Sequence, residues 1–244
     1  ANMLANEMFL DSAALRSSVV SHAKTLGYEP TSCRAPVATV NISLETDSPT
    51  KTMVAGTAFT TTVDGTSFQF VTIADITASN IGNTVAFDST SLYEGTYVTI
   101  KYIVDTSDVE QRFILTDDRA DTSTLTVQVQ NAVNDSNLTT YTKATDITQL
   151  SATSSVYYLQ EVENGRFEVY FGDDVVSKAL SDGNVVILKY VVTNKTAANG
   201  ASSFSAPYTI DGVSTIVITP VSSAGGGAEP ESLDSIKLQA PLDF

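Results

Sequence analysis

The sequence predicts a mainly β protein with a helical segment at its N-terminal end, and three observations lead to this fold class. Apolar residues recur at three- and four-residue steps before residue 30, and at every second position from Val37 onward. Turn signals such as Asp-Gly and Asn-Gly separate the alternating stretches. Threonine is frequent throughout, which suits the pleated surface of a sheet. Short strands separated by turns favour β-sandwich or barrel-like modules over a βαβ fold.

The N-terminal segment is predicted to be an amphipathic helix. Asp11 or Ser12 is expected to cap it, and Gly27 to end it, with Pro30 preventing its resumption. The apolar stripe has to pack either on this chain's own β-domain or on a neighbouring subunit, since its spacing approximates a heptad. The stripe comprises Leu4, Met8, Leu15, Val19, His22 and Leu26, of which Leu15, Val19, His22 and Leu26 are the candidate subunit contacts.

A first block of strands follows the helix. Val37–Leu44 alternates apolar and polar residues and predicts a half-buried strand. Ala58–Val63 and Thr66–Ile73 flank Asp64-Gly65, a dipeptide favoured in type I′ hairpin turns because both residues tolerate positive φ. Thr84–Asp88 is a further short strand.

A second block of strands is predicted from Tyr97 to Val192. Tyr157–Glu161 and Arg166–Phe171 form a hairpin, with Phe167, Val169 and Phe171 on one face and Arg166, Glu168 and Tyr170 on the other. Asn184–Val192 is apolar on both faces apart from Lys189, which predicts a central strand. The block also contains predicted strands at Tyr97–Val104, Arg112–Leu115 and Leu125–Gln130.

The chain loosens after the second block. Asn194–Ser203 is polar, Val213–Thr219 returns as a strand, and Ser222–Glu231 is a flexible joint by composition. The possible hinge is Gly225, Gly226 and Gly227.

Composition excludes several classes of function. A formal charge of −15 over 244 residues argues against binding nucleic acid, whose phosphates require a basic surface. No apolar run approaches the length of a membrane span. Cys33 and His22 are the only residues of their types, so neither a disulfide framework nor a zinc site is predicted. No cofactor motif or catalytic motif is present, so we expect no cofactor, no metal and no enzyme activity.

The clustered carboxylates favour turns over chemistry. Asp173 and Asp174 are adjacent, so on a strand they would point to opposite faces. Arg119 lies in the middle of the run that contains Asp117, Asp118 and Asp121, which disfavours calcium there. Aspartate is favoured in turns because its carboxylate binds nearby backbone amides.

Three segments resemble a known family. The block Phe113–Asn194 resembles the β-region of the baseplate wedge protein of T-even-type contractile-tailed phages, within the baseplate J-like group. The likeness is strongest over Tyr157–Asn194, with FGDD at Phe171–Asp174 and SDGN at Ser181–Asn184. Asn6–Tyr28 is similar to the helix before that region, and 224–244 to the joint after it. The family commonly has Asp before Ala-Glu-Ser in that joint, whereas this chain has Gly227-Ala228-Glu229-Pro230-Glu231-Ser232.

The resemblance implies a domain organisation. Residues 1–36 would form the helical segment, 37–94 and 196–221 a first β-domain, 95–195 a second β-domain inserted into the first, and 222–244 a joint leading to a further domain. The chain would then be an internal piece of a longer protein, since it does not begin with Met.

The resemblance also implies a structural role in the virion's tail baseplate, after assembly in the host cytoplasm. The partners would be other wedge proteins and a second copy of the chain, bound through regions outside this piece, and conformational change would pass to sheath contraction. Neither nucleic acid nor membrane insertion is expected. The alternatives are a β-sandwich adhesin or carbohydrate-binding module, which the lack of Trp disfavours, and a hydrolase, which rests only on clustered Asp residues.

Overall fold

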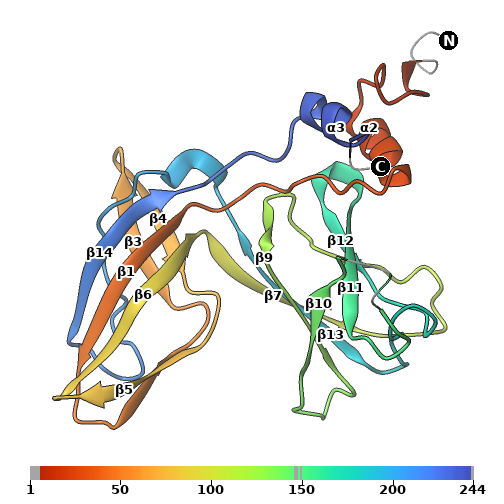
Figure 1. Cartoon of the computed structure of the whole chain (residues 1–244). Helices are drawn as coiled ribbons and strands as arrows, with labels where there is room; N and C mark the ends of the chain where they lie inside the picture. The colour runs from red at the N-terminus through yellow and green to blue at the C-terminus, as the bar shows by residue number, and fades with distance from the viewer. Residues whose placement is uncertain (1–5, 146–147, 149, 243–244) are drawn as a thin grey trace. The chain divides into compact units, whose positions relative to one another are not determined.

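The computed structural model describes residues 6–145, 148 and 150–242. With 43% strand and 11% helix, it confirms the prediction of a mainly β protein. The strands form two seven-stranded sheets (Figure 1). The chain divides into two compact units. Unit 1 is Ala1–Ser32, Thr99–Lys189 and Pro230–Phe244, and unit 2 is Cys33–Val98 and Tyr190–Glu229.

The elements run in the following order. They are α2 (Arg16–Thr25), β1 (Val37–Glu45), β2 (Thr50–Met53), β3 (Ala58–Val63), β4 (Thr66–Val71), β5 (Ile76–Ile81), β6 (Thr84–Glu94), β7 (Thr96–Ile103), β8 (Phe113–Ile114), β9 (Ala120–Gln130), β10 (Thr139–Lys143), β11 (Val156–Glu161), β12 (Phe167–Tyr170), β13 (Val185–Val192), β14 (Ile216–Gly225) and α3 (Leu233–Gln239). Short 3-10 turns lie at Glu163–Gly165 and Lys195–Ala198.

Strand β1 organises the sheet of unit 2, whose order is β14-β1-β6-β4-β3, with β5 paired to β6 and β2 paired to β5. Both neighbours of β1 are antiparallel to it. Every second residue of β1 is buried, as the alternation predicted. The core of this unit comprises Ala38, Val40, Ile42, Leu44, Met53, Phe59, Phe70, Val85, Phe87, Leu92, Ala198, Ala201, Ile210 and Ala224.

The sheet of unit 1 has the order β7-β13-β9-β10-β11-β12-β8. Strand β13 lies between two others and is buried on both faces, which confirms the central strand predicted from its apolar run. Tyr102, Phe113, Phe171 and Tyr141 form a chain of edge-to-face contacts with ring centroids 5.5–5.6 Å apart. This geometry sets the positive edge of one ring against the negative face of the next, which orients the core.

Helix α2 ends as predicted but begins differently. Gly27 has φ +81°, and the amide of Tyr28 donates to the carbonyl of Ala23, which completes a Schellman ending. The predicted cap at Asp11 or Ser12 is wrong, because the helix begins at Arg16. The carboxylate of Glu7 instead accepts from the amide of Ala14 at 2.9 Å and from that of Leu15 at 3.3 Å. The bond from Ala14 is the main reason that the pKa of Glu7 is lowered.

Two details of the strands correct the sequence expectations, and a third adds to them. The prediction that the chain loosens at Ser222 is wrong, because β14 continues to Gly225 while paired with β1. Strand β9 already begins at Ala120, before the predicted start of this strand at Leu125. On β12 the face that carries Glu168 is covered, and Glu168 is only 4% exposed.

Candidate functional site

Helices α2 and α3 pack together in unit 1, at the two ends of the described chain (Figure 1). Val19 is fully buried in their shared core, and Leu26 packs against it. The stripe on α2 was expected to meet either a β-domain or another subunit, and within the chain Val19 and Leu26 pack against α3. The buried members of this core are Ala13, Val19, Val20, Ala23, Ile236 and Ala240.

The four candidate subunit contacts on α2 therefore differ in accessibility. Val19 and Leu26 are used inside the chain, whereas Leu15 is 47% exposed. His22 is partly buried, and its Nε2 lies 2.9 Å from the carbonyl oxygen of Glu7. Leu4 lies outside the described residues. Contact with a neighbouring subunit stays a prediction, and Leu15 is the most accessible of the four.

Arg16 fixes the helix pair to the sheet of unit 1. Its Nε donates to Oε1 of Glu161 at 2.6 Å and its Nη2 to Oε2 at 2.8 Å, so the guanidinium holds both carboxylate oxygens. Its Nη1 donates to the carbonyl of Glu231 at 2.6 Å. The side chain of Glu161, on β11, is only 1% exposed. One guanidinium thus joins the start of α2, a strand and the segment that precedes α3.

Glu231 brings together the segments before α3 and after α2. Its carboxylate accepts from the hydroxyls of Tyr28 and Ser235 and from the amide of Thr31, at 2.6–3.0 Å. Burial raises the pKa of Glu231, but these donors and Arg16 outweigh burial, so the pKa lies below its usual value. The ionised form is therefore the one that the fold stabilises.

We expect the stability contributed by Glu231 to depend on pH. A carboxyl whose pKa is lower in the folded than in the unfolded state stabilises the fold above the unfolded pKa, and this contribution is lost as the pH falls through the folded pKa. Replacing Glu231 by Gln should lower Tm at pH 7, and the difference from wild type should shrink below about pH 4. Thermal unfolding over this range measures it, with Glu229→Gln as the exposed control, since Glu229 is 61% exposed. An equal deficit at every pH would contradict the prediction.

The three candidate hinge glycines lie in different surroundings. Gly225 is the last residue of β14, and a Cβ there would meet nothing within 4 Å. Gly226 has φ +81°. Gly227 is enclosed: a Cβ there would lie 2.5 Å from the carbonyl oxygen of Lys195, and its own amide donates to the side chain of Asn199 at 3.0 Å. A hinge at these residues stays a prediction, and this local bonding would have to break before Gly227 moved.

This difference predicts unequal effects of two substitutions. We expect Gly227→Ala to lower the free energy of unfolding by about 2 kcal/mol, because the carbonyl it would contact belongs to the backbone. Gly225→Ala should change it by less than about 0.5 kcal/mol. Urea unfolding followed by circular dichroism compares the two. Equal losses would mean that the enclosure of Gly227 does not hold in solution.

A fully buried carboxylate ties together two distant segments of unit 2. Glu94, at the end of β6, is 0% exposed. It accepts from the hydroxyl of Thr193 at 2.7 Å, and from the amide and side chain of Asn194 at 2.8 and 2.7 Å. Next to it, Gly95 has φ +124°, and a Cβ there would lie 2.1 Å from the carbonyl oxygen of Val192. The chain thus leaves β6 and returns after β13 at one closely packed point.

A second buried carboxylate lies in the sheet of unit 1. Glu168 Oε2 accepts from Nε and Nη2 of Arg112 at 2.9 and 2.6 Å, and from the hydroxyl of Tyr170 at 3.0 Å. Burial and this bond to Glu168 raise the pKa of Tyr170 to about 12. These groups join β12 to the segment before β8 and form a structural network.

The clustered aspartates bind nearby backbone amides, Asp117 and Asp173 in loops and Asp121 within strand β9. Asp117 accepts from the amide of Arg119 at 2.9 Å, and Asp121 from the amide of Ser123 at 2.9 Å. Asp173 accepts from the amide of Val175 at 3.0 Å. Within the described ranges, no group of three or more His, Cys, Asp or Glu side chains is arranged to hold a metal ion. Over the same residues, no helix is both long and apolar enough to cross a bilayer.

Comparison with known proteins decides the family resemblance. Residues 99–201 match the family model of the bacteriophage baseplate wedge protein gp6, third domain. The chain is also 28% identical over 264 aligned residues to baseplate wedge protein gp6 of Enterobacteria phage T4, in an alignment that covers 97% of this chain. The resemblance to baseplate wedge proteins is confirmed. The chain spans 39% of the length of that relative.

The likeness to baseplate wedge proteins supports a structural role in the tail baseplate of a virion. The residues matched by the third-domain model include β8–β13 and the ion pair of Arg112 with Glu168. A non-enzymatic role agrees with this likeness, because the relative is named for its place in an assembly. The likeness favours the structural interpretation over the adhesin interpretation.

Proposed function

We propose that this chain is part of a baseplate wedge subunit that assembles with sibling wedge proteins and transmits conformational change to sheath contraction. The observation that carries the proposal is the match of residues 99–201 to the third domain of the wedge family. The partners would include a second copy of the protein, bound through regions outside this chain.

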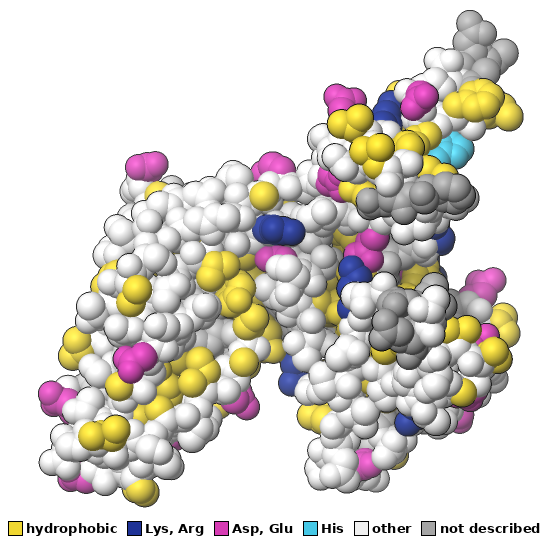
Figure 2. Space-filling model, in the orientation of Figure 1, with side chains coloured by type: hydrophobic (Ala, Val, Ile, Leu, Met, Phe, Trp, Pro, Cys, Tyr) yellow, Lys and Arg dark blue, Asp and Glu magenta, His cyan; other side chains and the backbone are white. Residues whose placement is uncertain are grey.

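The surface of each unit supports a role in assembly. Figure 2 shows apolar side chains reaching the surface between scattered acidic ones. In unit 1, Val109 is 95% exposed and Val175 74%, and in unit 2, Tyr208 is 92% exposed and Ile81 83%. A contiguous apolar patch marks a surface that other proteins cover, whereas single exposed residues such as these are common on any protein, so they are only candidate contact positions.

The domain organisation proposed for this role is an insertion. Residues 37–94 and 196–221 would form one β-domain, and 95–195 the inserted one. The pairing of β14 with β1 supports the first, since it brings a late strand back to an early one. The contacts of Glu94 with Thr193 and Asn194 support the second, since they hold both ends of the inserted segment. Movement between rigid modules of this kind would have to occur outside Asn194–Ser203 and Ser222–Gly225, because Ala198 and Ala201 lie in the core of unit 2 and Ser222–Gly225 pairs with β1.

Two measurements test the proposal. Co-expression of the full-length protein with its sibling wedge proteins should yield one complex on size-exclusion chromatography. Cryo-electron microscopy of tails before and after contraction should show a changed angle between the two units. Absence of the complex would remove the wedge role, and an unchanged angle would remove the proposed transmission of movement.

A further inference from the structure

Strand β6 has a stretch of open edge in the described structure of unit 2. One of its edges pairs with β1 from Thr84 to Tyr93. The other pairs with β5 only at Thr84 and Val85, and with β4 only at Tyr93 and Glu94. Between these two contacts, no described strand pairs with Ala86–Leu92 along this edge.

The direction of the backbone groups follows from the bonds at the ends of this stretch. The amide of Glu94 donates to Pro36, beside β1, and the amide of Gly95 donates to Gln69 on β4. Because successive residues of a strand alternate in direction, Ser91 directs its amide and carbonyl toward the open edge. At the other end of the stretch, Thr84 pairs with Ile81 of β5 across the turn. By the same alternation from Thr84, Ala86 and Asp88 also direct their amide and carbonyl groups toward the open edge. Three residues of β6 therefore present backbone groups for a further strand.

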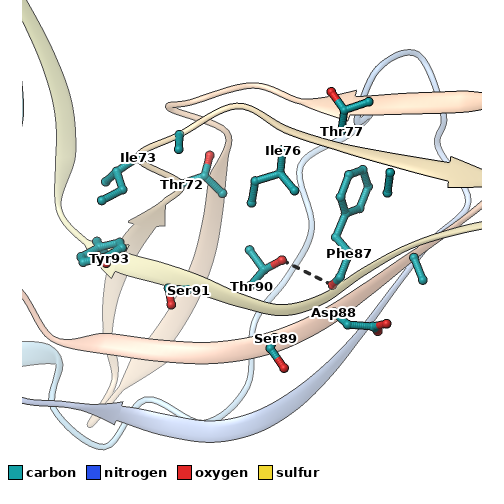
Figure 3. A pocket seen from close by; sticks show the side chains of 13 residues that line it. Thr72, Ile73, Ile76, Thr77, Phe87, Asp88, Ser89, Thr90, Ser91 and Tyr93 are labelled. Atoms are coloured by element: carbon teal, nitrogen blue, oxygen red, sulfur yellow. Dashed lines mark hydrogen bonds between the residues drawn. The ribbon is translucent and has the colours of Figure 1, made fainter. Parts of the chain in front are cut away.

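A hollow of about 410 Å³ lies beside this edge (Figure 3). Ile73, Ile76, Phe87 and Tyr93 give it apolar surface. Asp88 is its acidic lining residue, and neither Lys nor Arg lines it. The hollow gives an added strand both space and a place for its apolar side chains.

The edge is interrupted but not closed. Ser89 has φ +51° and its amide donates to the side chain of Asn41, so a bulge turns this one residue toward β1. The end strand β14 of the same sheet differs, because Pro220 within it has no amide hydrogen to offer. In unit 2, the outer edge of β14 thus lacks one backbone donor at Pro220, whereas the unpaired edge of β6 lies beside the hollow.

Charge indicates what kind of segment could occupy the hollow. The basic side chains of unit 2 are Arg34, Lys51 and Lys195, and the last two lie within 4.0 Å of Asp211 and Glu229. Acidic side chains outnumber basic ones in this unit, and Asp88 lies at the hollow itself. A basic segment would therefore be attracted and an acidic one repelled.

We propose that the open edge of β6 at Ala86–Leu92 binds an extended, Lys- or Arg-bearing segment of a sibling wedge protein as an added strand. Backbone hydrogen bonds to Ala86, Asp88 and Ser91 would supply affinity, and the apolar hollow would supply specificity. The inference rests on the proposed function, because it names the partner's chemistry.

Hydrogen exchange on the free chain tests the edge itself. The amides of Ala86, Asp88 and Ser91 should exchange at least about 100-fold faster than those of Val85, Thr90 and Leu92, which face β1. Equal protection would mean that the edge is closed, and would overturn the proposal.

Binding is tested with synthetic ten-residue peptides tiled across the wedge proteins encoded beside this one. At least one basic peptide should bind the chain and slow exchange at Ala86, Asp88 and Ser91. Asp88→Lys should weaken that binding at least about 10-fold, whereas Asp47→Lys, an exposed control outside the hollow, should not. Ser91→Pro should also weaken it, since it removes one outward amide and leaves the bonds to β1.

Failure of this inference is distinguishable from failure of the proposed function. Binding that leaves these amides unprotected, equal binding by Asp88→Lys and wild type, or no binding by any peptide would each overturn the inference. If full-length protein carrying Ser91→Pro still forms the wedge complex, the edge is not the contact, although the wedge role stands. Loss of the complex in that variant, with an unchanged circular dichroism spectrum, would support the edge.

Discussion

Replacing Gly95 by Ala is expected to lower the free energy of unfolding by about 3 to 5 kcal/mol, a large part of the stability of an ordinary domain. A Cβ at this position would lie 2.1 Å from the carbonyl oxygen of Val192 and 2.9 Å from a side-chain carbon of Val191. The first contact is with backbone, so no rotamer change can relieve it. The φ of +124° adds strain for any residue with a side chain.

Gly82 offers a matched control for this prediction. It also has positive φ, at +61°, but a Cβ there would meet nothing within 4 Å. Gly82→Ala should therefore cost only about 1 kcal/mol, the conformational strain alone. Urea unfolding followed by tyrosine fluorescence compares the variants, since the chain has 10 Tyr and no Trp. Equal losses for Gly82→Ala and Gly95→Ala would show that the close approach to Val192 does not occur in solution.

Local patterns predicted the strands whose partners are near in sequence. The bounds of β3 at Ala58–Val63 agree with the expectation, because Asp64-Gly65 fixes the hairpin register and both residues take positive φ. The central strand β13 was evident from its continuous apolar run. Gly27 ended α2 as predicted, because a positive φ is readily available to glycine.

Strands without a clear apolar alternation of their own were missed. Strands β2 and β10, with the sequences TKTM and TTYTK, lack a clear apolar alternation, and pairing with β5 and β9 defines them. The end of β14 over Ser222–Gly225 looks flexible by composition but pairs with β1. In these cases tertiary pairing overrides local propensity.

The buried carboxylates of the candidate site were also beyond local sequence reasoning. Glu94 and Asn194 are 100 positions apart, and Glu161 and Arg16 are 145 apart. One sequence signal was available for two of them: Glu161 and Glu168 lie in predicted strands among apolar and aromatic residues. Such a position indicates a paired carboxylate, because an unpaired charge is rarely buried, but it does not identify the partner.

Because an unpaired buried charge is costly, Arg16→Ala is expected to lower the free energy of unfolding by about 3 to 5 kcal/mol, the second large effect. The side chain of Glu161 is 1% exposed, so removing the guanidinium leaves a buried carboxylate without the cation that holds both its oxygens. Loss of the bond to Glu231 would also loosen the joint between α2 and α3. Arg16→Lys should give an intermediate loss, since lysine keeps the charge but lacks the fork.

Two further variants separate burial of the charge from loss of an ion pair. Lys195→Ala removes a pair whose acidic partner is 61% exposed, and should cost less than about 1 kcal/mol. Glu161→Gln in the Arg16→Ala background should recover part of the loss, because the neutral amide costs less to bury than an unpaired carboxylate. Urea unfolding of wild type, the three single variants (Arg16→Ala, Arg16→Lys and Lys195→Ala) and the double variant gives these free energies. A loss for Arg16→Ala no larger than that for Lys195→Ala, with no recovery in the double variant, would mean that Glu161 is hydrated, and that the helix pair is held to the sheet by apolar packing alone.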